Sequence, residues 1–120
     1  MANTRWADIF NHLQQAGYDV YPPGVKEGKC TQRYIVVKDA GISEAASVSS
    51  NLALYDVMLY VPKHSYSTLE AWKNEVQSVM DGLFPMIRPT HFVSTSFYDE
   101  TVEAWMVSVQ YQNVQKKVRA

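Results

Sequence analysis

The chain has 120 residues, 47% hydrophobic and 19% charged, which is ordinary for one globular domain and excludes an intrinsically disordered chain. Eleven basic residues against twelve acidic ones leave a net charge of −1, which disfavours a domain that binds the phosphate groups of nucleic acid. The single cysteine, Cys30, excludes an intrachain disulfide, and no apolar run approaches the roughly 20 residues that cross a bilayer.

The first helix is predicted over residues 4–16. Its apolar side chains recur at helical spacing and form one stripe, made of Trp6, Ile9, Phe10 and Leu13. Asn3 or Thr4 can cap the first turn by accepting hydrogen bonds from its free backbone N–H groups. Gly17 stands where a residue in the left-handed conformation commonly ends a helix.

A short extended piece and a first strand follow the helix. Residues 18–21 are predicted to be extended, and Pro22-Pro23-Gly24 then forces a turn. The β-branched and aromatic residues 34–38 predict a strand, because such side chains fit a pleated surface. Asp39-Ala40-Gly41 is expected to close this strand.

A long strand is predicted over residues 52–61. Residues 42–51 before it are small and polar, and they are predicted to be a mobile loop or the frayed start of this strand. Alternate residues of a strand point to opposite faces of the sheet. One face carries Ala53, Tyr55, Val57, Leu59 and Val61, and the other carries Leu52, Leu54, Asp56, Met58 and Tyr60. Both faces are largely apolar, and Pro62 ends the strand.

The second helix has a clear start signal at residues 67–70. Ser67-Thr68-Leu69-Glu70 is a capping box, in which Ser67 caps the backbone N–H of Glu70 and Glu70 reaches back. A continuous apolar stripe follows, made of Leu69, Trp72, Val76, Val79, Met80 and Leu83. Asp81-Gly82 weakens the end of this helix, and Pro85 stops it.

The last third of the chain is predicted to be a hairpin. Residues 91–98 and 102–113 alternate as strands, and residues 99–101 supply the turn. In the second strand Trp105, Val107, Val109 and Tyr111 belong in a core, whereas Ala104, Met106, Ser108 and Gln110 suit solvent. Residues 114–120 are predicted to be a flexible C-terminal tail.

The resulting order is α-β-β-α-β-β over a single domain, residues 1–120. The simplest way to bury both helical stripes is an α+β fold with two helices packed on one face of a four-stranded antiparallel sheet. The opposite face would then expose apolar side chains, and an exposed apolar patch commonly marks an interface. The candidate interface residues are Leu52, Leu54, Met58 and Tyr60.

No catalytic, cofactor-binding or metal-binding residue is predicted. A second His or Cys at a metal-ligand spacing is missing around each of the three histidines, His12, His64 and His91. Residues 22–29 (PPGVKEGK) do not meet the phosphate-loop pattern, and the G-x-S-x-G motif of a serine nucleophile is absent. An enzyme is therefore the least favoured class, and no cofactor is expected.

Several short sequence motifs accompany this order of helices and strands. The N-terminal helix is followed by V-Y-P-P-G at residues 20–24, the strand at residues 34–38 and Y-D-V-M-L-Y-V-P at residues 55–62. The helix at residues 69–83 and the terminal hairpin complete the pattern. On these features, over nearly its full length, the chain resembles phage tail terminator and head–tail joining (tail completion) proteins.

The resemblance implies a structural protein of virion assembly and not an enzyme. Subunits of such a family form a ring, usually a hexamer, that caps the tail tube, stops its polymerisation and offers a surface for joining the head. The implied partners are copies of the chain itself, the tail tube protein and the head connector or neck protein, with DNA only as the passing genome. The implied location is the tail or neck of the virion, and the host cytoplasm during assembly.

Two alternatives remain. A neck or head-closure protein of the same particle would bind the connector in place of the tube. A small-molecule-binding regulatory α+β domain would have a pocket with convergent polar groups between sheet and helices.

Overall fold

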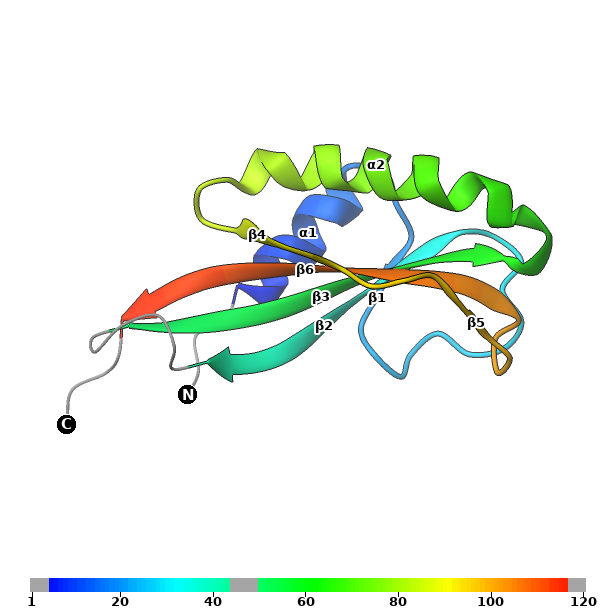
Figure 1. The fold of residues 1–120 in the computed structure, drawn as a ribbon, viewed down its shortest axis with the longest axis horizontal. Helices are drawn as coiled ribbons and strands as arrows, with labels where there is room; N and C mark the ends of the chain where they lie inside the picture. The colour runs from blue at the N-terminus through cyan, green and yellow to red at the C-terminus, as the bar shows by residue number, and fades with distance from the viewer. Residues whose placement is uncertain (1–4, 44–49, 117–120) are drawn as a thin grey trace.

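A computed structural model describes residues 5–43 and 50–116. Figure 1 shows a layer of helices above one long, twisted sheet. The helices are α1 (Trp6–Gln15) and α2 (Leu69–Met80), with 3-10 turns η1 (Lys63–Thr68) and η2 (Asp81–Leu83) at the two ends of α2. The strands are β1 (Val20–Tyr21), β2 (Tyr34–Ser43), β3 (Ser50–Pro62), β4 (Arg88–Val93), β5 (Phe97–Asp99) and β6 (Ala104–Lys116).

The strands form one mixed sheet in the order β1-β2-β3-β6-β4, with β5 also paired to β6. Strand β1 runs parallel to β2, and every other pair is antiparallel. The predicted α+β class with two helices is confirmed. The sheet has six strands where the sequence predicted four, because residues 20–21 add a short parallel strand and the predicted strand 91–98 is divided into β4 and β5.

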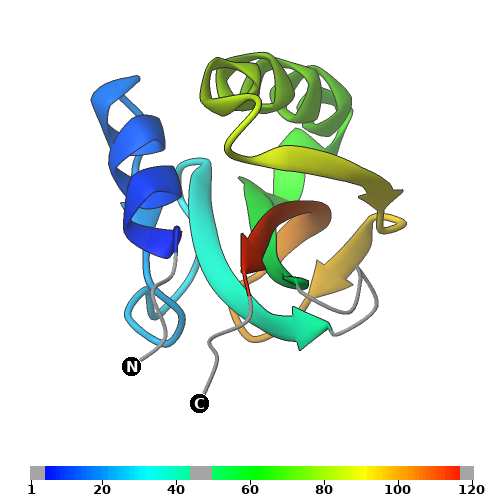
Figure 2. The same ribbon diagram turned by 90° about the vertical axis from the view of Figure 1, so that its left-hand side faces the viewer.

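Both helices cover the same face of the sheet, as the end-on view shows (Figure 2). The helical stripes meet the odd-numbered residues of β3 in the main core, whose largest fully buried side chains include Ile9, Leu13, Tyr55, Leu59, Trp72 and Met80. Burying each large aliphatic side chain of this kind contributes about 1.5–3 kcal/mol. The Trp6 indole Nε1 ties α1 to the sheet by donating to the Val37 carbonyl oxygen at 2.7 Å.

A second, smaller core lies on the helix-free face. It contains Cys30, Tyr34, Val36, Tyr60, Ala104 and Met106. The loop between β1 and β2 covers this cluster, and the Cys30 N–H donates to the Val102 carbonyl oxygen at 2.7 Å. The prediction that Ala104 and Met106 suit solvent is therefore wrong. These two residues alternate away from the helices as expected, but a distant loop buries them.

Two predicted boundaries differ from the structure. Strand β2 does not close at residues 39–41 but runs on to Ser43 through a β-bulge, where Gly41 has φ +100° and its N–H donates to the Asp39 carboxylate at 2.9 Å. Residues 42–43 belong to β2, residues 50–51 begin β3, as the predicted alternative of a strand start allows, and β6 takes residues 114–116 of the predicted tail. The remainder of those two predictions, residues 44–49 and 117–120, lies outside the described residues.

The capping box predicted for the second helix does not form. Helix α2 begins at Leu69, directly after the 3-10 turn η1, and Thr68 makes no side-chain capping bond. Ser67 lies inside that turn, and Glu70 pairs with Lys73 at 3.1 Å. Helix α1 matches its predicted stripe. Its N-cap residue is Arg5, which makes no side-chain capping bond, and Asn3 and Thr4 lie outside the described residues.

Candidate interaction surfaces

The four candidate interface residues lie on the even-numbered positions of β3, facing away from the helices. Leu52, Leu54 and Met58 are half-buried, and Tyr60 is only 8% exposed. The ring of Tyr60 stacks on Tyr34, with centroids 4.7 Å apart, inside the second core. Tyr60 is therefore a core residue of the folded subunit. Of the four candidate interface residues, only Leu52, Leu54 and Met58 can contact a partner.

A polar row divides the remaining residues of this face. Lys38, Asp56 and Gln110 are paired across β2, β3 and β6 and so share the helix-free face. This row lies between Leu54 and Met58 along β3. The apolar end of the sheet consists of Leu52, Leu54 and Val114, where Val114 pairs with Leu52 and is 56% exposed. We call these three residues the distal patch.

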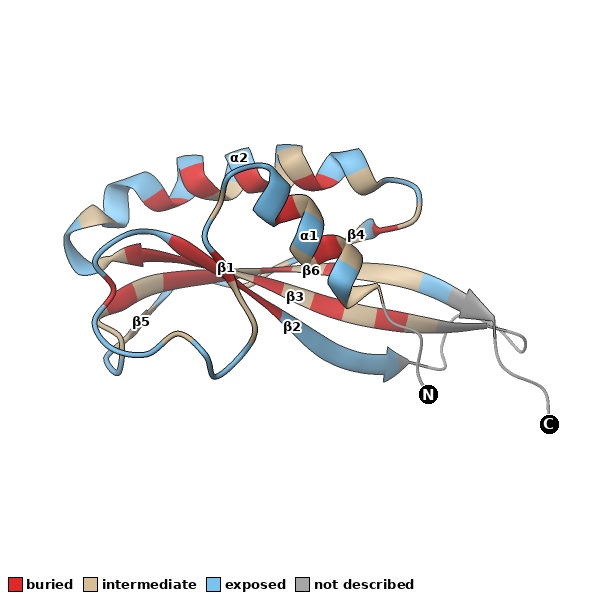
Figure 3. Ribbon diagram, turned by 180° about the vertical axis from the view of Figure 1, so that it is seen from behind, coloured by how far each residue is buried: buried red, intermediate tan, exposed pale blue. Residues whose placement is uncertain are grey.

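The distal patch lies where β2, β3 and β6 run on past the helices at one end of the molecule (Figure 1). Seen from behind, the last part of β2 beside it is exposed (Figure 3). Sequence reasoning missed Val114, because that residue was assigned to the C-terminal tail. The alternation of apolar and polar side chains in β6 reverses at Asn113 and Val114, so no periodic signal points to Val114.

Three exposed aromatic side chains lie in or next to strands β4 and β5. Phe84, Phe92 and Phe97 are 61%, 58% and 47% exposed. The guanidinium of Arg88 stacks over the Phe84 ring, 5.4 Å from its centroid. Sequence reasoning did not single out these side chains; the break at residues 94–96 places Val93 and Phe97 on opposite faces, which simple alternation does not predict.

The free edges of β2 and β4 carry features that block further pairing. The free part of β2, beyond its two-residue pairing with β1, contains Lys38 and the bulge at residues 39–41. Strand β4 contains Pro89, and His91 has a left-handed backbone with φ +69°. Charged residues, bulges and prolines of this kind protect sheet edges from adding another strand.

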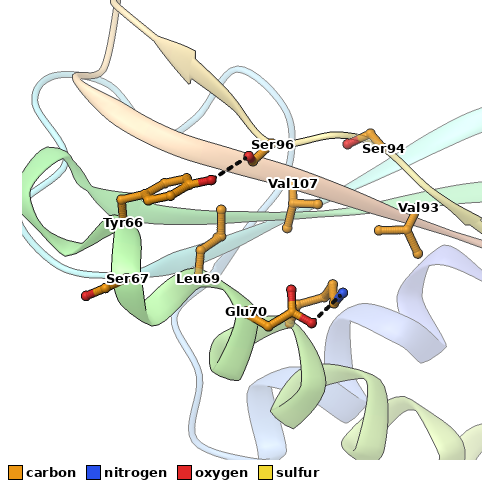
Figure 4. Close-up of a pocket in the computed structure, with 9 residues that line it drawn as sticks. Tyr66, Ser67, Leu69, Glu70, Val93, Ser94, Ser96 and Val107 are labelled. Atoms are coloured by element: carbon orange, nitrogen blue, oxygen red, sulfur yellow. Dashed lines mark hydrogen bonds and ion pairs between the residues drawn. The ribbon is translucent and has the colours of Figure 1, made fainter.

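A semi-enclosed cavity of about 260 Å³ lies between α2 and the β4–β5 segment (Figure 4). Its lining residues are Tyr66, Ser67, Leu69, Glu70, Lys73, Val93, Ser94, Ser96 and Val107. We call it the α2 cavity. Its volume falls below the roughly 300–1,000 Å³ of typical small-molecule pockets. The cavity is large enough for one side chain.

Most polar clusters have structural explanations. The Tyr18 hydroxyl donates to the Glu75 carboxylate at 2.7 Å, and Arg33 contacts Glu75 at 3.5 Å while stacking 4.0 Å over Trp72. Burial, followed by the bond to Glu75, raises the pKa of Tyr18 to about 12, so this phenol stays protonated as a donor. These contacts join the residues that precede β1 and β2 to helix α2.

The single thiol is equally structural. Cys30 is buried and its Sγ donates to the Gln32 carbonyl oxygen at 3.2 Å. Burial raises the pKa of the thiol, which lowers the thiolate fraction that a nucleophile or metal ligand needs.

The three histidines lie apart. His12 shares a 2.7 Å hydrogen bond with the Val79 carbonyl oxygen between the two helices, whereas His64 and His91 are exposed. Across residues 5–43 and 50–116, no group of three His, Cys, Asp or Glu side chains is placed to hold a metal ion. Within the same residues, neither helix has the length and apolar character needed to span a membrane.

Comparison with known proteins adds no relative to these observations. No protein-family model matches the chain, and no curated protein matches it.

Proposed function

We propose that this chain is a structural subunit of a phage tail, a terminator that assembles into a ring on the end of the tail tube. The observation that carries the proposal is the placement of its exposed apolar side chains. Val25, 58% exposed, lies in the loop after β1, and Ile42, 54% exposed, lies in β2. Phe92 and Phe97 lie at the opposite edge of the sheet, in β4 and β5. Exposed apolar side chains thus occur at both edges of the sheet, and the two edges carry different residues.

Two different surfaces suit a head-to-tail contact. A two-fold dimer uses one self-complementary patch on both subunits, whereas a ring joins one patch of each subunit to another patch of the next. The protected outer strands favour contacts through side chains over continuation of the sheet. These features support a closed ring of identical subunits, with roughly six copies as the usual number for the family that the sequence resembles.

The distal patch is the proposed contact with the tail tube or the next subunit. Its three aliphatic side chains carry no charge, and they lie on the face of the sheet opposite the helices, near the start of β3 and the end of β6. Burying them would remove apolar surface from water at about 25 cal/mol per Å². The net charge of −1 suits a ring through which DNA passes without being held.

The test is assembly in the presence and absence of tube protein. Light scattering and negative-stain microscopy should give a ring with a central hole, either for the protein alone or once it is mixed with the purified tail tube protein. Tubes polymerised with the protein should also be shorter than tubes polymerised without it. A protein that stays monomeric and leaves tube length unchanged would refute the proposal.

A charge in the distal patch tests the contact itself. Leu54→Glu should abolish the ring or its attachment to the tube, because the carboxylate would have to be buried without a partner. Gln110→Glu is the matched control, since it adds the same charge to the polar row of the same face. An unchanged oligomer mass for Leu54→Glu would contradict the assignment of the patch. Binding to the head connector but not to the tube would favour the neck protein alternative.

A further inference from the structure

The residues at the two ends of the long strand β6 carry opposite charges. Residues 99–103, at the turn from β5 into β6, contain three acidic residues and no basic one (Asp99, Glu100 and Glu103). Residues 114–120, at the end of β6 and after it, contain three basic residues and no acidic one (Lys116, Lys117 and Arg119). Glu44, the one acidic residue between β2 and β3, offsets only one of these charges. At about 3.3 Å per residue, the 13 residues of β6 span about 40 Å, so the acidic turn and the basic end of β6 lie at opposite ends of the molecule (Figure 1).

Arg88 adds a further positive charge beside the distal patch. It pairs with Gln112, which in turn pairs with Leu54, so Arg88 is in one cross-strand row with the patch. Arg88 and Val114 also line the same groove, of about 400 Å³. The Arg88 side chain is exposed, and its Nε donates to the Pro85 carbonyl oxygen at 3.2 Å. Because no carboxylate of the described residues forms an ion pair with it, the guanidinium can take one from another molecule.

Exposed apolar side chains accompany both charged ends of the helix-free face. The distal patch supplies them at the basic end. At the acidic end Phe97 is 47% exposed, and it pairs with Met106, a residue of the second core on the same face. Each end of this face therefore combines apolar surface with charge, and the two charges have opposite signs.

Glu100 is the carboxylate of the acidic turn that is available for an ion pair. Asp99 Oδ1 accepts hydrogen bonds from the N–H and the hydroxyl of Thr101, at 3.0 Å and 2.6 Å. Glu103 lies 3.7 Å from the Nζ of Lys29. Glu100 is exposed, and within residues 5–43 and 50–116 no ion pair engages it.

The two ends complement each other, so a second copy of the chain supplies the partner for each. We propose that the distal patch and Arg88 of one copy bind Phe97 and Glu100 of the next. The Arg88 guanidinium pairs with the Glu100 carboxylate, and the Phe97 ring covers the aliphatic side chains of the patch. This inference rests on the proposed ring and names the two surfaces that meet in it.

Charge also sets the direction of the contact. Two basic ends, or two acidic turns, that faced each other would place like charges together, which opposes such a pairing. A contact between unlike ends leaves one basic end and one acidic end unused, so it repeats from copy to copy until the ring closes.

The experiment exchanges the two charges and measures ring formation, with tail tube protein present if the native chain needs it. Arg88→Glu and Glu100→Arg should each lower the fraction of protein in rings at least about tenfold, because each places like charges together at the contact. The double variant should restore the rings, because it rebuilds the ion pair with the signs exchanged. Light scattering measures the mass, and negative-stain images show the rings.

A matched control separates this contact from an effect of net charge. Glu27→Arg makes the same change as Glu100→Arg at an exposed position of the loop between β1 and β2, and it should leave the rings intact. Melting temperatures of all variants verify folding. Rings that resist both single charge reversals, or that the double variant does not recover, would overturn the pairing of Arg88 with Glu100.

The remaining outcomes separate this inference from the proposed function. A closed dimer in place of a ring would overturn the head-to-tail direction. Rings of Arg88→Glu that form normally but no longer bind the tube would assign the patch to the tube and overturn a second copy as its partner. A native chain that forms no ring even with tube protein would refute the proposed function as well, whereas intact rings of both single variants would refute this inference alone.

Discussion

Gly82 lies against the imidazole ring of His12, and this contact predicts a substitution whose effect depends on a second residue. A Cβ atom added to Gly82 would lie 3.0 Å from both Cε1 and Nε2 of His12. The same Nε2 makes the 2.7 Å hydrogen bond with the Val79 carbonyl oxygen. For Gly82→Ala to fit, the ring must move by a few tenths of an ångström, and that movement weakens the bond.

The two energies involved have opposite signs. Gly82 does not have a left-handed backbone, so alanine gains about 0.4–1 kcal/mol from the reduced freedom of the unfolded chain. Loss of the His12 hydrogen bond costs about 0.5–1.5 kcal/mol. The effect of Gly82→Ala in the native background should therefore lie between about 0.5 kcal/mol of stabilisation and about 1 kcal/mol of destabilisation. It should be stabilising once His12→Ala has removed the ring.

The assay is a double-mutant cycle measured by urea unfolding of four proteins. They are the native chain, Gly82→Ala, His12→Ala and the double variant. The expected interaction free energy is about 1 kcal/mol, well above the roughly 0.3–0.5 kcal/mol scatter of independent sites. Effects that add within that scatter would show that the ring does not constrain position 82, and the proposed packing between α1 and the end of α2 would be wrong.

Three further outcomes follow from buried side chains. Trp72→Phe should lower the free energy of unfolding, measured in urea, by less than about 1.5 kcal/mol because it keeps most of the ring volume. Trp72→Ala should lower it by about 3–5 kcal/mol, and equal losses for the two variants would contradict the close packing of Trp72. Iodoacetamide should alkylate Cys30 slowly until urea unfolds the chain, since burial raises the pKa of the thiol, and fast labelling of the folded protein would refute its burial. The free energy of unfolding should fall as pH rises above about 10, because the folded chain keeps phenolic protons that the unfolded chain loses. A urea midpoint that stays constant there would contradict the raised pKa values, which belong to Tyr18, Tyr34, Tyr55, Tyr60 and Tyr111.

The helices and the main core could be predicted because their signals are local and periodic. The stripe of α2, from Leu69 to Met80, and the odd-numbered residues of β3 face each other as their spacing implies. The short strand β1 could not be predicted, since two residues carry no period. Its parallel pairing with β2 depends on a long-range bond from the Ile35 N–H to the Asp19 carbonyl oxygen at 2.9 Å.

The candidate surfaces were harder to predict, because exposure depends on what distant segments cover. Leu54 and Tyr60 have the same place in the alternation of β3, yet the loop that carries Cys30 covers only Tyr60. The break between β4 and β5 at residues 94–96 reverses the alternation, so that Val93 pairs with Val109 on the helix side whereas Phe97 pairs with Met106 on the other face. The α2 cavity joins η1 and α2 to β4 and β6, and no sequence motif spans that distance.

The central claim is that the subunit works through its surfaces as part of a closed ring. Mass measurement and negative-stain images of the protein mixed with purified tail tube protein test it most directly. The expected result is a ring with a central hole at the end of a tube whose growth has stopped, and loss of that ring in Leu54→Glu but not in Gln110→Glu. A monomer that neither binds the tube nor limits its length would contradict the claim.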